Sequence, residues 1–252
     1  MIELNKLTKR FAQHTVVDGL SFQVAPGEVL GFLGPNGAGK STTMKMLSGF
    51  LTPSSGTARV FGADIGKQTL TVQRQIGYLP EGAPCYGDMT VRGFLDFIAE
   101  IRGFRGAEKR RRVAAVLGQL ELEPVQRQTI DTLSKGFKRR VGLAQAILHD
   151  PRVLILDEPT DGLDPNQKHE MRALIRRIAP DKAIVISTHI LEEVEAVCTR
   201  AIIIADGRIV ADQTPQELMM RETSVRRVQV IVNRDQAALV LDSFSPEAGF
   251  HE

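Results

Sequence analysis

Residues 34–42 read Gly-Pro-Asn-Gly-Ala-Gly-Lys-Ser-Thr, and this stretch decides the fold. It fits the pattern Gly-x-x-x-x-Gly-Lys-Ser/Thr, with Gly34, Gly39, Lys40 and Ser41 at the fixed positions. Glycines let a backbone wrap closely around a phosphate chain and turn its N–H groups inward. A short apolar run at 29–33 precedes the stretch, and a helical pattern begins at 43. The sequence therefore predicts a phosphate-binding loop between a strand and a helix.

The loop predicts a nucleotide site with bound Mg²⁺. The helix that follows aims the positive end of its dipole at the phosphates. We expect Lys40 to reach the β- and γ-phosphates, the Ser41 hydroxyl to bind Mg²⁺, and Thr42 to contact the α-phosphate. The loop residues Asn36, Gly37 and Ala38 complete the predicted nucleotide-binding set. The alternative is a glycine-rich turn that precedes a lysine by chance, and the flanking strand and helix argue against it.

Composition limits the class of protein. The chain has 252 residues, enough for one large or two small domains. Its net charge of +2 gives no sign of a nucleic-acid partner or an anionic membrane. Cys85 and Cys198 are too few for a disulfide framework or a metal cluster, so we expect two reduced thiols. The N-terminus does not resemble a signal peptide, and no apolar run approaches the roughly 20 residues of a membrane helix. We therefore expect any role at a membrane to depend on a partner.

A second group of residues supplies the chemistry of hydrolysis. The continuously apolar run at 153–156 is typical of a parallel strand covered on both faces, and it ends in Asp157 and Glu158. Carboxyl ends of such strands are where α/β sheets build their sites. We expect Asp157 to hold Mg²⁺ and Glu158 to act as the general base for the attacking water, with two solvated turn carboxylates as the alternative. His189 also stands at a strand end and could contact the γ-phosphate, but a single histidine is more often structural.

The alternation of strands and helices predicts an α/β fold. We expect a helical insertion at about 88–148, with one helix capped by Thr90 and a second at about 107–120. The basic run at 109–112 is interpreted as a solvated face rather than a docking patch. Residues 224–252 contain one strand pattern and one helix pattern, too little to bury a core. They are predicted to be an appendage, or the start of an incomplete accessory domain, after a domain at 1–223.

Over about residues 1–220, the order of these motifs resembles the nucleotide-binding subunit of an ATP-binding cassette (ABC) transporter. The matching stretches are Gly34 to Thr42 (Walker A), Tyr78 to Glu81 (Q-loop), Leu133 to Phe137 (signature), Leu154 to Thr160 (Walker B), Gly162 to Asp164 (D-loop) and Thr188-His189 (switch histidine). The resemblance implies a P-loop NTPase fold with a RecA-like mixed sheet, an N-terminal antiparallel β subdomain and a helical subdomain. It also implies that Phe11 stacks on adenine, whereas its sequence context alone favours a half-buried strand residue.

Two motifs depart from the family pattern, the Q-loop and the signature. Glu81 stands where the family has glutamine, and its carboxylate is still expected to bind Mg²⁺. The signature carries Lys135 and Phe137 where the family has glycine and glutamine, but keeps Ser134 and Gly136, the expected phosphate contacts. Lys135 either adds a cation near the phosphates or points to solvent. The whole pattern resembles bacterial gliding-motility and multidrug-export subunits, which pair with separate membrane proteins.

The resemblance implies a mechanism that needs two chains. Each ATP lies between the Walker A loop of one subunit and the signature of the other, so two copies enclose two ATP molecules. Asp164 in the D-loop is among the nucleotide-binding residues that the resemblance implies. The implied partners are an identical second subunit and separately encoded integral membrane permease subunits, with no nucleic acid. The implied location is the cytoplasmic face of the inner membrane, where the chain is peripheral.

Two other functions remain open on the sequence. One is a soluble ABC ATPase without transport, for example in cofactor assembly. A chromosome-type member is disfavoured, because Lys40 and Asp157 lie only 117 positions apart (157 − 40) with no heptad run between them. The other is a nucleotide-binding regulator that does not hydrolyse, which Asp157, Glu158 and His189 together argue against.

Overall fold

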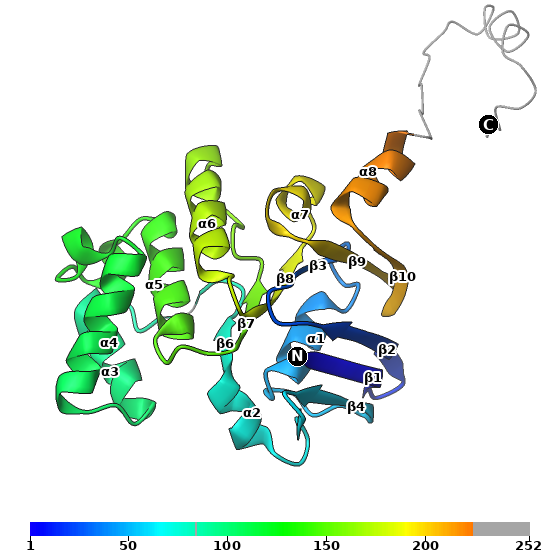
Figure 1. Ribbon diagram of the computed structural model, residues 1–252, viewed down its shortest axis with the longest axis horizontal. Helices are drawn as coiled ribbons and strands as arrows, with labels where there is room; N and C mark the ends of the chain where they lie inside the picture. The colour runs from blue at the N-terminus through cyan, green and yellow to red at the C-terminus, as the bar shows by residue number, and fades with distance from the viewer. Residues whose placement is uncertain (84, 224–252) are drawn as a thin grey trace, which may run out of the picture. The chain divides into compact units, whose positions relative to one another are not determined.

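The computed structural model describes residues 1–83 and 85–223 (Figure 1). Its larger sheet has six strands in the order β10-β9-β3-β8-β7-β6. All neighbouring pairs are parallel except β9 and β10. The strands are β3 (Val29–Leu33), β6 (Ile76–Leu79), β7 (Val153–Asp157), β8 (Ala183–Thr188), β9 (Arg200–Ala205) and β10 (Arg208–Gln213). The predicted α/β class with a mixed central sheet is confirmed.

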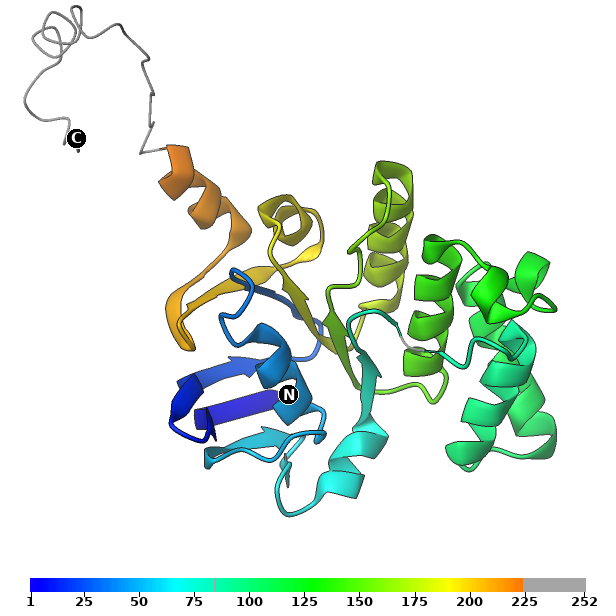
Figure 2. The ribbon, with the colours of Figure 1, turned by 180° about the vertical axis from the view of Figure 1, so that it is seen from behind.

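A second, antiparallel sheet is formed mainly by the N-terminal part of the chain. Its order is β2-β1-β4-β5, from β1 (Ile2–Phe11), β2 (His14–Val24), β4 (Ser55–Val60) and β5 (Ala63–Asp64). The helix α1 (Lys40–Leu47) follows the predicted phosphate loop and lies over this sheet (Figure 2). Met44, Met46 and Leu47 of α1 join one core with both sheets, which contribute Phe22 from β2 and Phe32 from β3. This packing fixes the helix whose first residue is Lys40.

Strand β7 is buried on both faces, as its apolar sequence predicts. Val153 and Ile155 enter the core with α1 and the antiparallel sheet. Leu154 and Leu156 enter a second core with the helices on the other face. Alternate side chains of a strand point to opposite faces, so one five-residue strand joins the two cores. The carboxylates at its end are therefore held by a rigid element.

The helical insertion packs beside the sheet. Helices α3 (Val91–Ile101) and α4 (Gly106–Gln119) lie beyond α5 (Lys135–Ile147), away from the parallel strands (Figure 1). The Thr90 hydroxyl accepts a hydrogen bond from the Gly93 N–H and caps α3, as expected. In the basic run, Lys109 pairs with Glu100, and Arg112 with Glu108. Short 3₁₀ turns, Glu123–Val125 and Ile130–Thr132, replace regular helix in the segment before α5.

The remaining helices are α2 (Thr69–Gln75), α6 (Pro165–Ile178), α7 (Leu191–Val197) and α8 (Pro215–Thr223). The chain divides into a unit at Met1–Glu217 and a unit at Leu218–Glu252. The strand and helix expected within 224–252 lie outside the described residues, and the boundary at 223 stays a prediction. In the part of the chain that the structure describes, no helix combines the length and apolarity needed to span a bilayer.

Candidate functional site

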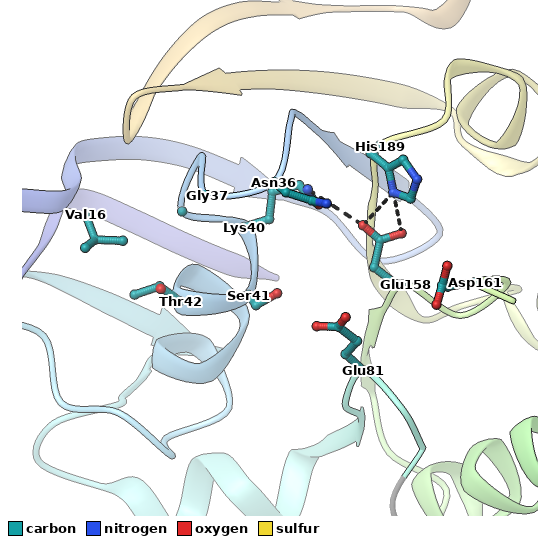
Figure 3. Close-up of a pocket in the computed structure, with 11 residues that line it drawn as sticks. Val16, Asn36, Gly37, Lys40, Ser41, Thr42, Glu81, Glu158, Asp161 and His189 are labelled. Carbon is teal, nitrogen blue, oxygen red and sulfur yellow. Dashed lines mark hydrogen bonds and ion pairs between the residues drawn. The ribbon is translucent and has the colours of Figure 1, made fainter.

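The phosphate loop, the end of β7 and the end of β8 open onto one pocket of about 350 Å³ (Figure 3). Most of the predicted site residues are among those that line it. The lining residues are Val16, Asn36, Gly37, Gly39, Lys40, Ser41, Thr42, Glu81, Glu158, Asp161 and His189. The fold thus brings together side chains that lie more than 140 positions apart in the sequence (189 − 40).

Two glycines allow the loop to pass close to neighbouring backbone. A Cβ atom on Gly34 would lie 2.4 Å from the Ile204 carbonyl oxygen, and one on Gly39 would lie 2.7 Å from that of Val16. Gly39 also has a φ of +103°, which side chains other than glycine rarely tolerate. Both positions therefore require glycine for the loop to keep its path.

Lys40 is almost fully buried beneath the loop. Its ammonium donates hydrogen bonds to the carbonyl oxygens of Gly34 at 2.7 Å and Pro35 at 3.2 Å. It also lies 3.7 Å from the Glu158 carboxylate, with which it forms an ion pair. A buried cation held on one side by carbonyl groups is available to an anion that enters the loop. Lys40 and Glu158 are thereby in direct electrostatic contact across the pocket.

Asp157 is held by two hydroxyl groups. Ser41 on α1 donates a hydrogen bond to Asp157 Oδ1 at 3.2 Å, and Ser187 on β8 donates another to the same oxygen. The Asp157 side chain is 1% exposed, so it is oriented within the protein rather than by water. The Ser41 oxygen and the Asp157 carboxylate, both predicted to serve Mg²⁺, therefore lie side by side.

Glu158 and His189 form a direct pair. His189 Nδ1 lies 3.1 Å from both carboxylate oxygens of Glu158. The Glu158 backbone has a φ of +49°, an uncommon conformation for a residue with a side chain and one that clusters at functional sites. Burial raises the pKa of Glu158, although the hydrogen bond from His189 and the charge of Lys40 act against this rise. The geometry gives a buried carboxylate in direct contact with a histidine.

The oxygen atoms present fit Mg²⁺. Ser41, Asp157 and Glu81 offer a hydroxyl and two carboxylates, and the Glu81 carboxylate points toward Ser41 across the pocket (Figure 3). Within residues 1–83 and 85–223, no cluster of three His, Cys, Asp or Glu residues could hold a metal alone. Mg²⁺ usually takes one or two protein carboxylates and completes its shell with phosphate oxygens and water. These residues fit that mode of binding.

Several predicted residues lie elsewhere. Phe11 is 48% exposed at the end of β1 and does not line the pocket, and the Lys9 ammonium lies 5.0 Å from its ring centroid. The Ser134 hydroxyl accepts from the Phe137 N–H at 3.4 Å and caps α5, and Gly136 is in the first turn. Asp164 caps α6 through the Gln167 N–H at 2.9 Å. Ser134, Gly136 and Asp164 thus mark two helix N-termini outside this pocket.

Three residues of the site were not predicted from the sequence. Val16 and Asp161 line the pocket, and the Ser187 hydroxyl orients Asp157 while accepting a hydrogen bond from the Glu158 N–H at 3.1 Å. Val16 and Ser187 come from strands whose sequences show only an apolar pattern. Asp161 lies three residues beyond Glu158, and its position after a strand end was the one signal available.

Comparison with known proteins gives consistent results. The sequence profile of the family described as "ABC transporter" matches residues 17–161. A Nod factor export ATP-binding protein I of Paraburkholderia xenovorans is 38% identical over 96% of this chain and 81% of that protein. A probable multidrug ABC transporter ATP-binding protein of Escherichia coli is 36% identical over 86% of this chain and 38% of its own length.

Solved structures share the fold. The ATP-binding subunit of an ABC transporter has a TM-score of 0.78 and 30% identity, and the match covers 96% of this chain and 100% of that one. A protein from Clostridium perfringens that is part of the ABC transporter complex cbiONQ has a TM-score of 0.81 and 28% identity, with 88% and 92% coverage.

Proposed function

This chain belongs to the ABC transporter family as an ATP-binding subunit that hydrolyses ATP, and we propose that it powers a membrane exporter as one of two identical copies. Each copy would bind MgATP in the pocket described above. The partner would be a separately encoded integral membrane permease. The chain would then sit on the cytoplasmic face of the inner membrane, attached through that permease.

One observation carries the proposal: Lys40 and Ser41 of the phosphate loop lie in the same pocket as Glu158 and His189. A phosphate loop alone provides binding, whereas hydrolysis also requires a positioned base for water. Glu158 is in contact with the histidine at 3.1 Å and with the lysine at 3.7 Å. This arrangement, in which residues that follow β3, β7 and β8 share one pocket, supports roles for them in binding and in water activation.

Each residue has a role in the proposed reaction. The loop N–H groups and Lys40 would hold the β- and γ-phosphates, and Ser41, Asp157 and Glu81 would hold Mg²⁺. When bound, Mg²⁺ neutralises negative charge on the phosphates. Ionised Glu158 would accept a proton from the attacking water, and His189 would orient Glu158 and support the γ-phosphate. Phe11 would stack on the adenine, and Ser134, Gly136 and Asp164 would face the ATP held by the second copy.

Export is supported by the name of the Nod factor export ATP-binding protein I, which is 38% identical to this chain. The relative named as a probable multidrug ABC transporter protein is 36% identical, and its name gives a different cargo. The two names therefore favour no single substrate for this chain.

A surface groove supports the membrane partner. About 980 Å³ in volume, it is lined by residues of α1, α2, β6, α3 and α5 and by the loops beside them. Three large apolar side chains in its lining are strongly exposed: Phe50 and Leu70 at 72% each, and Ile101 at 65%. Exposed apolar surface of this kind marks a site of interaction with another protein.

The charge of the groove suggests what fills it. Lys45, Arg74 and Arg102 also line it. Neither Lys45 nor Arg74 has an ion-pair partner among the described residues, and burial lowers the pKa of Arg102. A cytoplasmic segment of the permease with an apolar face and an acidic residue would complement this surface. The groove also includes Pro80, the neighbour of Glu81, so its occupant would lie close to the nucleotide.

The test separates binding from turnover. We expect Lys40→Ala to weaken ATP binding by about 10- to 100-fold, because it removes charge-assisted hydrogen bonds of about 1.5–3 kcal/mol. Glu158→Gln should bind MgATP normally and lose a factor of about 10²–10⁴ in kcat, the range for general-base catalysis. Calorimetric titration and phosphate release measure the two quantities. Normal hydrolysis by the Gln variant would remove Glu158 from the role of base.

A further inference from the structure

Glu193 is a charged side chain in an unusual place. It lies in the first turn of α7 and is only 5% exposed. Its Oε2 accepts a hydrogen bond from the Thr188 hydroxyl at 2.8 Å. Its Oε1 accepts one from the Thr160 hydroxyl and lies 3.4 Å from the Lys168 ammonium. Both carboxylate oxygens are therefore engaged, and each is bonded to a different part of the chain.

The partners of Glu193 flank the two residues proposed for water activation. Thr188 is the last residue of β8 and directly precedes His189. Thr160 follows Glu158 by two residues, in the loop after β7, and Lys168 is near the start of α6, where that loop ends. One carboxylate thus joins the loop that carries Glu158 to the loop that carries His189.

Burial of this charge is not explained by packing. A buried ion costs several kcal/mol of desolvation, which a pair regains only with good geometry, and an apolar side chain of similar size is often as stable. The neighbouring Val194 and the inner residues of β8 are apolar, so such a core is available nearby. The Glu158–His189 contact depends on two separate loops, and a group that holds both loops preserves that contact.

We propose that Glu193 is a positioning residue that locks the His189 loop to the Glu158 loop, so that base and histidine keep their contact as the site works. The inference deepens the proposed function and rests on it. Glu193 does not line the pocket that contains Lys40 and Glu158. Its effect reaches the reaction through Thr188 and His189 on one side and through Thr160 and Glu158 on the other.

The two arms of the bridge can be removed one at a time. Thr188→Val and Thr160→Val each delete one hydroxyl with little change of volume. Each should lower kcat by up to about 10²-fold, the loss typical of a small misplacement in a reacting site. The kcat of the double variant should be no lower than that of either single variant, because a bridge broken at one end no longer joins the loops. Affinity for ATP should stay within about twofold, since the phosphate loop is untouched.

A matched pair of variants tests whether Glu193 acts through His189. Glu193→Gln should lower kcat in the wild-type background and have no further effect in the His189→Ala background. Glu192→Gln removes the same charge from the preceding, exposed position of α7 and should leave kcat unchanged. The proposal is overturned if Glu193→Gln lowers kcat as much in the His189→Ala background as in the wild type. It is also overturned if Thr188→Val and Thr160→Val each leave kcat unchanged, or if their separate losses of kcat multiply in the double variant.

A second readout needs no turnover. In hydrogen exchange on the ATP-free protein, Glu193→Gln and Thr188→Val should speed exchange in the peptides around 158–164 and 186–192 together. Glu192→Gln should change neither peptide. Failure of the wild-type chain to hydrolyse ATP would contradict the proposed function and leave this exchange pattern as the test of the bridge. Exchange that changes in only one of the two loops would overturn the bridge itself.

Discussion

At the scale of single residues, Glu158 is under two opposing influences. The residue is 8% exposed, and burial raises the pKa of its carboxyl group because water no longer stabilises the charge. His189 and Lys40 stabilise the same charge and lower the pKa. Burial is the largest of these effects, so the net shift is upward. A base with a raised pKa binds its proton more readily from water at neutral pH, which suits the proposed role.

This shift predicts the pH dependence of hydrolysis. The base must be ionised, so kcat/KM should fall as the pH drops through the pKa of Glu158 in the free protein. Because this pKa is raised, the fall should begin above the pH of about 4.3 at which an ordinary glutamate titrates. Removing the stabilising contact in His189→Ala should move the fall to still higher pH. A fall at or below the ordinary value, or a shift to lower pH in the variant, would contradict this account.

Glu81 adds a negative charge to a pocket built for a polyanion. Removing this charge in Glu81→Gln should strengthen the binding of metal-free ATP. It should also reduce the gain in ATP affinity that Mg²⁺ provides. Exposed unit charges about 4 Å apart interact with about 1 kcal/mol, so the ratio of ATP affinities with and without Mg²⁺ should fall roughly fivefold. Calorimetric titration in Mg²⁺ and in EDTA measures this ratio.

Asp161 provides the matched control for Glu81. It is another pocket carboxylate, and it has no proposed role toward Mg²⁺. Asp161→Asn should therefore strengthen ATP binding equally with and without Mg²⁺, leaving the ratio unchanged. Equal ratios in wild type and Glu81→Gln would rule out Glu81 as a metal contact.

Only part of the pocket could be predicted from the sequence. The fixed spacing of Gly39, Lys40 and Ser41 encodes a local loop, and local geometry can be recognised in a linear pattern. Ser187 and Glu193 act through contacts with residues about 30 positions away, and neither belongs to a motif. Their role becomes visible only once the parallel pairing of β7 and β8 brings the two loops together.

At the scale of elements, prediction worked where a pattern was long or strongly apolar. Strand β7 and helix α3 were predicted close to their observed bounds, because burial on both faces and the Thr90 cap leave clear signals. Helix α2 was missed. It has seven residues and buries only Val72, so its sequence carries little periodicity. Its position depends on tertiary contacts beside the groove.

The groove predicts which substitutions should weaken binding of the proposed membrane partner. Leu70→Asp on α2 and Ile101→Asp on α3 place a charge on exposed apolar surface. Each should reduce recovery of the integral membrane partner from detergent extract by on the order of tenfold or more, as at a binding hot spot. Affinity for ATP should be unchanged. Recovery is measured by quantitative mass spectrometry after affinity purification.

Val210→Asp is the control for the groove variants. Val210 is 59% exposed on β10 and does not line the groove. The same charge at this position should leave recovery of the partner unchanged. If both groove variants keep the partner, the groove is not its docking site. Recovery of soluble partners alone would favour an ABC ATPase that does not act in transport.

At the scale of the whole molecule, the unit at Met1–Glu217 holds only half of the proposed reaction site. Ser134 and Lys135 are exposed at the start of α5, and neither lines the pocket that contains Lys40. Lys135 has no ion-pair partner in the described part of the chain. A helix N-terminus with free N–H groups and a nearby cation can bind an anion that another molecule holds. The proposed anion is the ATP bound by a second copy.

This arrangement predicts a change of mass with nucleotide. Glu158→Gln protein, which should bind ATP without consuming it, should be a monomer alone and double in mass with MgATP in light scattering. Lys40→Ala should remain a monomer at a MgATP concentration that just saturates the wild-type loop, because its weakened affinity leaves most of its sites without nucleotide. Ser134→Glu is the sharper control: it should bind ATP through its own intact loop and still remain a monomer, since its carboxylate repels the other copy's phosphates. Doubling by Ser134→Glu would place the contact between copies elsewhere, and a Glu158→Gln protein that stays monomeric with ATP bound would exclude a nucleotide-joined homodimer in the absence of the permease.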